Sequence, residues 1–197
     1  MRIRKEIQAV PRQAGVSIVF VRHGESEANV EGRISDNPER VVNLTEKGRI
    51  QASLVDPGEI DIAFCSEFHR ARQTAEIIFR RGPVLVDGRI NERKSGMDGR
   101  PVHEFNEMIL HDPVNFSPEG GESFIEEMTR VRRFLDEMAS LNQGKRVLAV
   151  SHENPILAAL ALAGMDPLEA ALGSIKNCQK VEISWPIGDR REGRSRA

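Results

Sequence analysis

The sequence of 197 residues predicts an α/β fold made of one domain. Short apolar segments typical of buried strands alternate along the chain with segments of helical periodicity, which is the pattern of an α/β protein. The chain contains no internal repeat, low-complexity tract or linker, and its length suits one hydrophobic core rather than two. Polar and charged residues also follow several strand segments directly, where a turn would be expected.

Five segments have the composition of strands. The first, VSIVFV at 16–21, is a β-branched run of the kind found in buried strands. The last, KVEISW at 180–185, alternates polar and apolar residues, so it is expected at an edge of the sheet. The predicted strands are 16–21, 61–65, 83–88, 146–151 and 180–185.

Six segments are predicted as helices. Thr45 and Ser66 are expected to cap the second and third of them, and Pro155 should lie in the first turn of the last. The fifth has the clearest periodicity, because its apolar residues recur at three- and four-residue steps and therefore share one face. The predicted helices are 24–30, 45–54, 67–79, 101–110, 124–138 and 154–164.

The formal net charge of −2 is unevenly distributed. Both ends are basic and the body between them is acidic, which argues against a nucleic-acid-binding protein. We therefore divide the chain into a basic extension at 1–15, one folded domain at 16–186 and a basic tail at 187–197. Solvated tails are the preferred interpretation of the two ends, and contact with a polyanion is the alternative.

The chain is expected to be a cytoplasmic protein without membrane contact. No apolar run approaches the roughly 20 residues that span a bilayer, and residues 1–15 lack the apolar core of a secretory signal. Cys65 and Cys178 are interpreted as reduced, buried thiols, with a disulfide as the alternative. The predicted edge strand at 180–185 would permit a homodimer, so monomer and homodimer both remain open.

Three strand ends carry groups suited to chemistry. Arg22, His23 and Gly24 follow the first strand, Ser66 follows the second, and Ser151 and His152 follow the fourth. Ligands of open α/β sheets bind outside the carboxyl ends of the strands, where helix N-termini also favour anions. These groups are therefore expected to meet in one anion-binding crevice.

The residue types at this crevice point to phosphoryl transfer onto nitrogen. Histidine is a nucleophile near neutral pH, and a neighbouring Arg22 favours the neutral imidazole of His23 by charge repulsion. Arginine forks also match phosphate oxygens in a bidentate fashion. The same arginine charges would repel a cation, so we expect neither a metal ion nor a cofactor.

Five motifs, in order along the chain, resemble those of the histidine phosphatase superfamily, which includes the cofactor-dependent phosphoglycerate mutases. The resemblance extends from about residue 16 to 163. It implies a three-layer α/β/α sandwich around a mainly parallel sheet, as in phosphoglycerate mutase. The motifs are VRHGESEAN at 21–29, SEFHRARQTA at 66–75, INERKSGMDG at 90–99, GGES at 120–123 and VLAVSH at 147–152.

The resemblance implies a role for each matched residue. His23 would be the nucleophile that becomes phosphohistidine, and Glu92 the general acid and then the general base. Arg22, Arg70 and His152 would hold the phosphoryl oxygens and stabilise the transferring group. Residues expected to line the phosphate pocket or to contact the rest of the substrate are Asn29, Arg33, Lys94 and His103.

The second motif contains two arginines, and an acidic residue follows the fifth motif. Arg70 and Arg72 are about 200° apart on a helix, so only one can face the site, and the motif register selects Arg70. Glu153 departs from the glycine that many relatives carry after the second histidine. Its carboxylate would repel a phosphate unless it points away or pairs with an arginine, which leaves the charge of the substrate open.

The predicted function is hydrolysis of phosphate monoesters through a phosphohistidine, with a small phosphorylated molecule as the substrate and a phosphoprotein as a second option. A phosphoglycerate mutase is the alternative enzyme, but it would need more basic residues than Lys94, Arg100 and the two histidines of the 94–120 segment. A non-catalytic phosphate-binding regulatory module is the alternative from a different class. That alternative is disfavoured because both the nucleophile and the acid are present.

Overall fold

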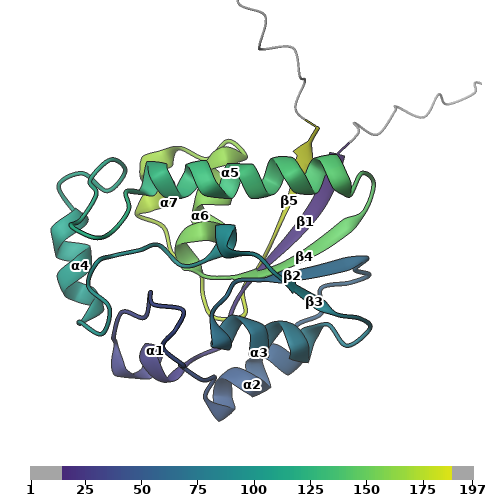
Figure 1. The fold of residues 1–197 in the computed structure, drawn as a ribbon, viewed down its shortest axis with the longest axis horizontal. Helices are drawn as coiled ribbons and strands as arrows, with labels where there is room; N and C mark the ends of the chain where they lie inside the picture. Colours follow the sequence, from purple (N-terminus) through teal and green to yellow (C-terminus); the bar gives the residue numbers. More distant parts are fainter. Residues whose placement is uncertain (1–14, 188–197) are drawn as a thin grey trace, which may run out of the picture.

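The computed structural model describes residues 15–187 of the chain (Figure 1). The predicted basic segments at 1–15 and 187–197 therefore lie, except for one residue each, outside the described residues, and their interpretation stays a prediction. Within 15–187, no helix is long and apolar enough to cross a membrane.

A five-stranded sheet forms the centre of the molecule, in the order β3-β2-β4-β1-β5. β1, β2, β3 and β4 are parallel to their neighbours, whereas β5 pairs with β1 in the antiparallel direction. The predicted mainly parallel sheet and the edge position of the last strand are thus confirmed. The strands are β1 Gly15–Arg22, β2 Ile62–Cys65, β3 Val84–Val86, β4 Arg146–Ser151 and β5 Lys180–Pro186.

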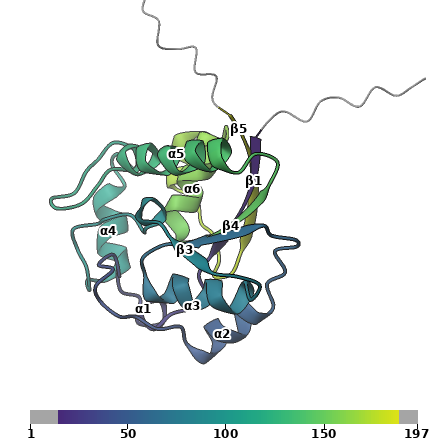
Figure 2. The same ribbon diagram turned by 45° about the vertical axis from the view of Figure 1, so that its right-hand side comes forward.

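Helices cover both faces of this sheet, as the predicted three-layer fold requires. The packing of α5 (Phe124–Leu141), α6 (Glu153–Leu162) and α7 (Pro167–Ala171) on one face forms the larger apolar core. On the other face, α3 (His69–Ile78) packs into a second core, and α2 (Glu46–Ser53) lies against α3. Figure 2 shows α5 and α3 on opposite sides of the strands.

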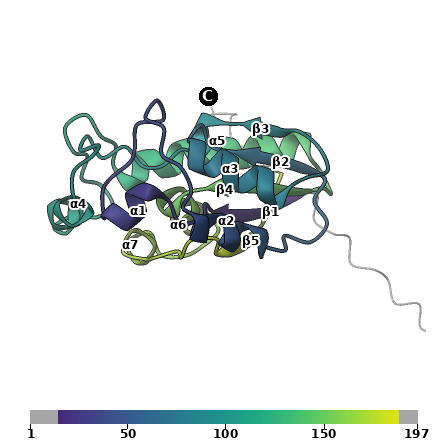
Figure 3. The same ribbon diagram turned by 90° about the horizontal axis from the view of Figure 1, so that it is seen from below.

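Two further helices lie beyond the carboxyl ends of the strands. α1 (Glu27–Glu31) and α4 (Val102–Ile109) gather with α7 at one end of the molecule, on the left of Figures 1 and 3. A short 3-10 helix, η1 (Gly88–Ile90), follows β3 and leads toward the same end. The three elements and η1 therefore surround the place where ligands of such sheets bind.

The predicted helix starts are confirmed in part. Thr45 caps α2 through the backbone N–H of Gly48, and Pro155 lies in the first turn of α6. The prediction that Ser66 caps the third helix is wrong, because α3 begins two residues later than a Ser66 cap requires, with Phe68 at its N-cap and no side-chain cap. The Ser66 hydroxyl instead bonds to His152, as described below. Neither α7 nor η1 was predicted.

The strand register places the carboxyl ends of β1, β2 and β4 at the same edge of the sheet. Arg22 of β1 is paired with Ser151 of β4, and Cys65 of β2 is paired with Val150 of β4. A close backbone approach then fixes the loop after β1, since a Cβ atom at Gly48 would collide with the carbonyl oxygen of Glu25. The register and this contact together orient the residue that follows Arg22.

Candidate active site

His23 lies buried at the carboxyl end of β1, with 2 % of its surface exposed. Its Nδ1 donates a 2.7 Å hydrogen bond to the carbonyl oxygen of Gly24, because a carbonyl can only accept. The proton is therefore on Nδ1, and Nε2 carries the lone pair. Burial first, then the charges of Arg70 and Arg22, lowers the pKa of His23 well below 6.5, which keeps the imidazole neutral.

Arg70 lies in the first turn of α3 and reaches across the crevice to both histidines. Its Nε donates to Nε2 of His23 at 3.0 Å, and its Nη2 donates to Nδ1 of His152 at 3.1 Å. Ser35 accepts from the same guanidinium through its hydroxyl and its carbonyl oxygen. Burial lowers the pKa of Arg70 to about 10, so the side chain stays charged at neutral pH. Arg72 is exposed, as the motif register implies.

His152 follows β4 and packs beside His23, with ring centroids 5.0 Å apart. Because Arg70 can only donate, Nδ1 of His152 accepts, and its proton is on Nε2, 2.7 Å from the Ser66 hydroxyl. Burial first, then the charge of Arg70, lowers the pKa of His152 well below 6.5. The strand ends after β1, β2 and β4 thus meet, as the sequence predicted.

Arg22 is held by Glu153, the acidic residue that stands where many relatives have glycine. Nη1 of Arg22 lies 3.1 Å from Oε2 of Glu153 and also donates to the carbonyl oxygen of Ile175. The other carboxylate oxygen of Glu153 accepts from the Ser174 hydroxyl at 2.8 Å and from the Ile175 amide at 2.9 Å. The Glu153 charge is therefore neutralised by an arginine of the site.

Glu92 lies in the loop after η1, close to His152. Its Oε2 is 4.0 Å from Nδ1 of His152, and its Oε1 accepts from the Arg93 amide and from Asn154. Burial raises the pKa of Glu92 above 4.5, although the Arg93 amide and the charge of Arg70 oppose this. A carboxyl group with a raised pKa can exist in its protonated form and donate a proton.

The loop that carries Glu92 is fixed by a second arginine. Arg130 of α5 donates to the carbonyl oxygens of Arg89 at 2.8 Å and Glu92 at 3.3 Å. Glu122 accepts from the Arg130 guanidinium at 2.7 Å and from the Lys94 amide at 3.1 Å. The GGES motif therefore does more than begin a helix, because Glu122 and Arg130 together hold the backbone on both sides of Glu92.

Five of these residues line a cavity of about 370 Å³, namely Arg22, His23, Arg70, Glu92 and Glu153, whereas His152 is fully buried beside His23 and is not part of the cavity wall. Asn29 and Arg33 also line it, as predicted. The Oδ1 atom of Asn29 accepts from Ser26 and Asn177, and Arg33 donates to the carbonyl oxygen of Gly99. Lys94 and His103 are exposed and do not line the cavity, so the structure gives no support to their predicted contact with substrate.

The sequence predicted no role in the site for four residues that contact or position its catalytic groups. Ser35 and Asn154 contact Arg70 and Glu92, while Glu122 and Arg130 hold the Glu92 loop. A serine, an amide and a surface ion pair have no pattern that separates them from ordinary polar residues. Only the possible pairing of Glu153 with an arginine was considered.

The arrangement suits an anion rather than a cation. Arg22, Arg70 and the neutral His23 line the cavity, with the neutral His152 packed beside His23. Within residues 15–187 no group of three or more acidic, histidine or cysteine side chains could hold a metal ion. A neutral imidazole beside two guanidinium groups can attack a phosphorus atom whose oxygens those groups hold. The nearby carboxyl group can exchange a proton with the departing or entering oxygen.

Comparisons with known proteins agree with this geometry. Residues 18–192 match the family model described as histidine phosphatase superfamily (branch 1). The chain is 31 % identical over 168 residues to an adenosylcobalamin/alpha-ribazole phosphatase of Escherichia coli, covering 77 % of this chain and 80 % of the relative. It is also 31 % identical over 189 residues to a 2,3-bisphosphoglycerate-dependent phosphoglycerate mutase of Gloeobacter violaceus, covering 86 % and 82 %.

A solved structure supports the fold. The alpha-ribazole phosphatase of Shigella flexneri superposes with a TM-score of 0.72 at 26 % identity, covering 84 % of this chain and 89 % of that chain. The relatives thus include both phosphatases and a mutase.

Proposed function

The chain belongs to the histidine phosphatase superfamily, and we propose that it hydrolyses small phosphate monoesters through a phosphohistidine on His23. The observation that carries the proposal is the state of His23. Its Nε2 lone pair faces the cavity floor beside Arg70, and its pKa is lowered by burial and by the two nearby arginines. A histidine in this state is a nucleophile at neutral and mildly acidic pH.

In the first step, Nε2 of His23 attacks phosphorus and the bond between phosphorus and the ester oxygen breaks. Before attack, Arg70 exchanges its bond to Nε2 for one to a phosphoryl oxygen, which frees the lone pair. Protonated Glu92 gives its proton to the departing oxygen, so that the alcohol leaves neutral. The products are the free alcohol, a phosphorylated imidazole and a Glu92 carboxylate.

In the second step, the Glu92 carboxylate takes a proton from water, whose oxygen attacks the phosphorus of phosphohistidine. The N–P bond breaks and its electron pair returns to Nε2, which restores the neutral imidazole and releases inorganic phosphate. Glu92 is again protonated, so the site is ready for another cycle. Glu92 lies 4.0 Å from His152 and lines the same cavity as His23, which supports both of its roles.

The remaining polar residues would bind the transferring phosphoryl group. Arg22 and Arg70 supply charged donors to its oxygens, and such donors stabilise charge that develops in the transition state. When Arg70 turns to the phosphate, the Ser66 hydroxyl can donate to Nε2 of His152 and its Nδ1 can carry the proton toward another oxygen. Asn29 and Arg33 line the same cavity and would contact the substrate more peripherally.

A mutase would need to hold a second phosphate group and to keep phosphohistidine away from water. Four arginines line the cavity. Arg22 and Arg70 would already hold the transferring phosphoryl group, and Arg93 is buried and donates to the carbonyl oxygen of Glu122. The fourth, Arg33, is bonded to Gly99 and lies 3.7 Å from a glutamate. This shortage of free cations favours the hydrolase over the mutase.

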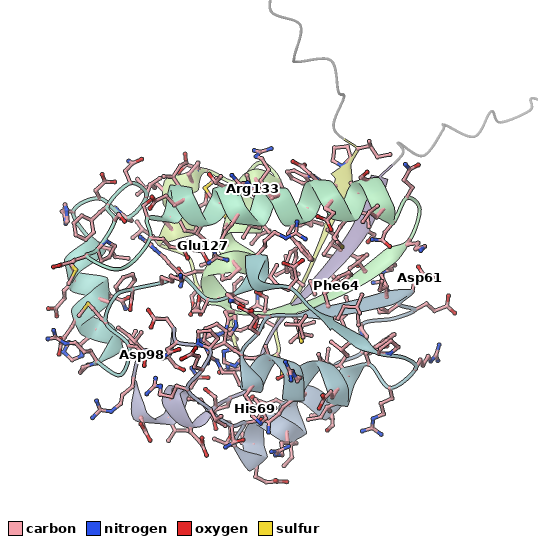
Figure 4. The ribbon with its side chains drawn as sticks, viewed as in Figure 1. Asp61, Phe64, His69, Asp98, Glu127 and Arg133 are labelled. Atoms are coloured by element: carbon pink, nitrogen blue, oxygen red, sulfur yellow. The ribbon has the colours of Figure 1, made fainter. Side chains whose placement is uncertain are left out.

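The proposal is tested by isotope labelling and by phosphate release. The protein is mixed with a ³²P-labelled monoester and quenched, and acid-labile, base-stable label is measured alongside free phosphate. We expect transient label on the wild-type protein, none on His23→Ala, and phosphate as the final product. His69→Ala is the matched control, because His69 lies on α3 outside the cavity wall (Figure 4).

Each other outcome has a clear meaning. Label that persists in His23→Ala would show that the nucleophile is a different residue. Isomerised ester without phosphate release would favour the mutase, and binding without any label would favour a phosphate-binding module.

A further inference from the structure

One face of α4 forms a wall of the cavity. Val102, Phe105, Asn106 and Ile109 line it, and their spacing of three and four residues places them on the same side of the helix. Phe105 and Ile109 are buried in a small apolar cluster, whereas Val102 and Asn106 are exposed. The helix therefore presents three apolar side chains and one amide to a bound molecule.

The facing wall has a similar character. Leu157 of α6 and Ala171 of α7 also line the cavity, and so does Ile34, which packs against the apolar cluster of Phe105 and Ile109. The polar groups in these walls that are not part of the phosphate site are mostly neutral. They are the amides Asn106 and Asn154 and the hydroxyl of Ser174.

Each charged residue of the cavity makes at least one bond to a protein group, and few of its charged atoms are left for a ligand. Arg22 and Glu153 neutralise each other, and Arg93 is 3 % exposed and donates to the carbonyl oxygens of Glu122 and Phe116. Nε of Arg22 and Nη1 of Arg93 have no hydrogen-bond partner among the described residues, but both nitrogens are buried. Arg33 donates to Gly99 beside a glutamate. Within the part of the chain that the structure describes, no lysine or aspartate lines the cavity.

We propose that the leaving group of the substrate is an uncharged alcohol with an apolar or aromatic body. This inference rests on the proposed function and adds the substrate class to it. An apolar body gains free energy by leaving water for the wall of α4 and the facing side chains. Neutral hydrogen-bonding groups on the alcohol find partners in Asn106, Asn154 and Ser174.

Charged leaving groups lack compensation in these walls. A carboxylate would lose hydration next to Glu153. The guanidinium nitrogens of Arg22 and Arg93 that have no partner in residues 15–187 are buried, so it would reach a cation only by displacing a bonded one or by opening the wall. An ammonium group would meet Glu153, which is paired with Arg22, and Glu92, whose Oε1 already accepts two hydrogen bonds. Both ionic classes are therefore expected to react more slowly than a neutral ester of the same shape.

Three benzyl phosphates that differ only in charge test the inference. They carry a para carboxamide, a para carboxylate or a para aminomethyl group, so the leaving alcohols have similar shape and nearly equal reactivity. We expect kcat/KM for the carboxamide ester to exceed both others by about tenfold or more, since an unpaired charge is costly to desolvate. Phosphate release is measured at fixed pH and ionic strength.

A charge placed on the α4 wall should reverse part of this preference. Asn106→Lys adds an exposed ammonium facing the cavity, and we expect the ratio of the carboxylate to the carboxamide ester to rise about fivefold, as one partly exposed ion pair allows. Met108→Lys is the matched control, because Met108 is exposed on the same helix but does not line the cavity. The control should leave the ratio unchanged.

The outcomes separate this inference from the function on which it rests. Phosphate release from all three esters at equal rates, or fastest from a charged one, would overturn the substrate class and leave the hydrolase in place. A preference for the carboxylate ester would mean that Arg33 or Arg93 binds the carboxylate of the leaving group. Failure to release phosphate from any of the three and from 4-nitrophenyl phosphate would overturn both proposals.

Discussion

The Nε atom of Arg70 donates a 3.0 Å hydrogen bond to Nε2 of His23, the nitrogen expected to attack phosphorus. This bond holds the imidazole in position and keeps its proton on Nδ1 while no substrate is bound. It also occupies the lone pair, so the guanidinium must turn to the phosphoryl group for attack to occur. The same contact thus orients the nucleophile, and the Nε2 lone pair becomes available only when a phosphoryl group draws Arg70 away.

Arg70→Lys should lower kcat/KM for a phosphate monoester by about 100-fold, the usual cost of removing an oriented donor to developing charge. A lysine ammonium cannot contact His23, Ser35 and His152 in the planar arrangement of a guanidinium. Steady-state kinetics measure the loss, and the melting temperature reports folding. Arg72→Lys on the exposed face of α3 is the control, and an equal loss there would contradict the assignment of Arg70.

Glu92→Gln should slow esters of poor leaving groups far more than esters of good ones. A glutamine cannot give a proton to the departing oxygen, and general acid catalysis typically contributes about 10²–10⁴-fold. The rate of phosphoenzyme formation should therefore fall more for an alkyl phosphate than for 4-nitrophenyl phosphate. Rapid-quench labelling measures this rate for each ester. Equal losses for the two esters would mean that Glu92 is not the proton donor.

The pH dependence of kcat/KM should show an acidic optimum. His23 must be neutral to attack phosphorus. Because its pKa is lowered below 6.5, protonation of His23 should reduce the activity of the enzyme only at pH values below 6.5. Glu92 must be protonated, and since its pKa is raised above 4.5, activity should fall as pH rises through that raised value. The pH profile of Glu92→Gln is the control, because the substrate phosphate titrates in the same way with both proteins. The part of the alkaline limb that Glu92 causes should be absent from the profile of the variant.

Arg130→Met should lower kcat by about tenfold or more with a smaller change in KM, because Arg130 positions the Glu92 backbone without touching the cavity. The alkaline limb of the pH profile should also shift, which a purely structural role would not cause. Arg133→Met is the control on the same helix, since the side chain of Arg133 is exposed (Figure 4). An unchanged pH profile in a folded Arg130→Met protein would remove Arg130 from the positioning of Glu92.

Glu127→Gln should be more stable than the wild type by an amount that grows with pH. Glu127 is fully buried on α5 and one of its oxygens has no partner among the described residues, so burial raises its pKa well above 4.5. The stability that the protonated carboxyl contributes is complete below pH 4.5 and is lost as pH rises toward the raised pKa. Urea denaturation from pH 5 to 8 measures the difference, and a constant difference would contradict the prediction.

Much of the fold could be predicted because its signals are local. The β-branched run before Arg22 and the spacing of the apolar residues in α5 follow from side-chain periodicity alone. The meeting of His23 and His152 was also predictable, since both follow strands of one mainly parallel sheet and the ends of such strands share an edge.

The failed cap at Ser66 shows where local reasoning stops. Serine before a helix is a good N-cap, but this hydroxyl is instead committed to His152, 86 residues away in sequence. The pairing of Arg22 with Glu153 and the bonds from Arg130 to the Glu92 loop are equally distant. No spacing rule encodes them.

The sequence by itself determined the five strand segments and the longer helices, because strand and helix periods depend on neighbours in the chain. The five residues proposed for the chemistry came from short motifs and the family that those motifs resemble. The tertiary structure alone decided which side chains support those residues and what character the cavity walls have. It excluded Lys94 and His103 from the cavity and turned one face of α4 toward it. The reason is that hydrogen-bond partners and cavity walls are set by distances in space between elements whose relative orientation no local pattern specifies.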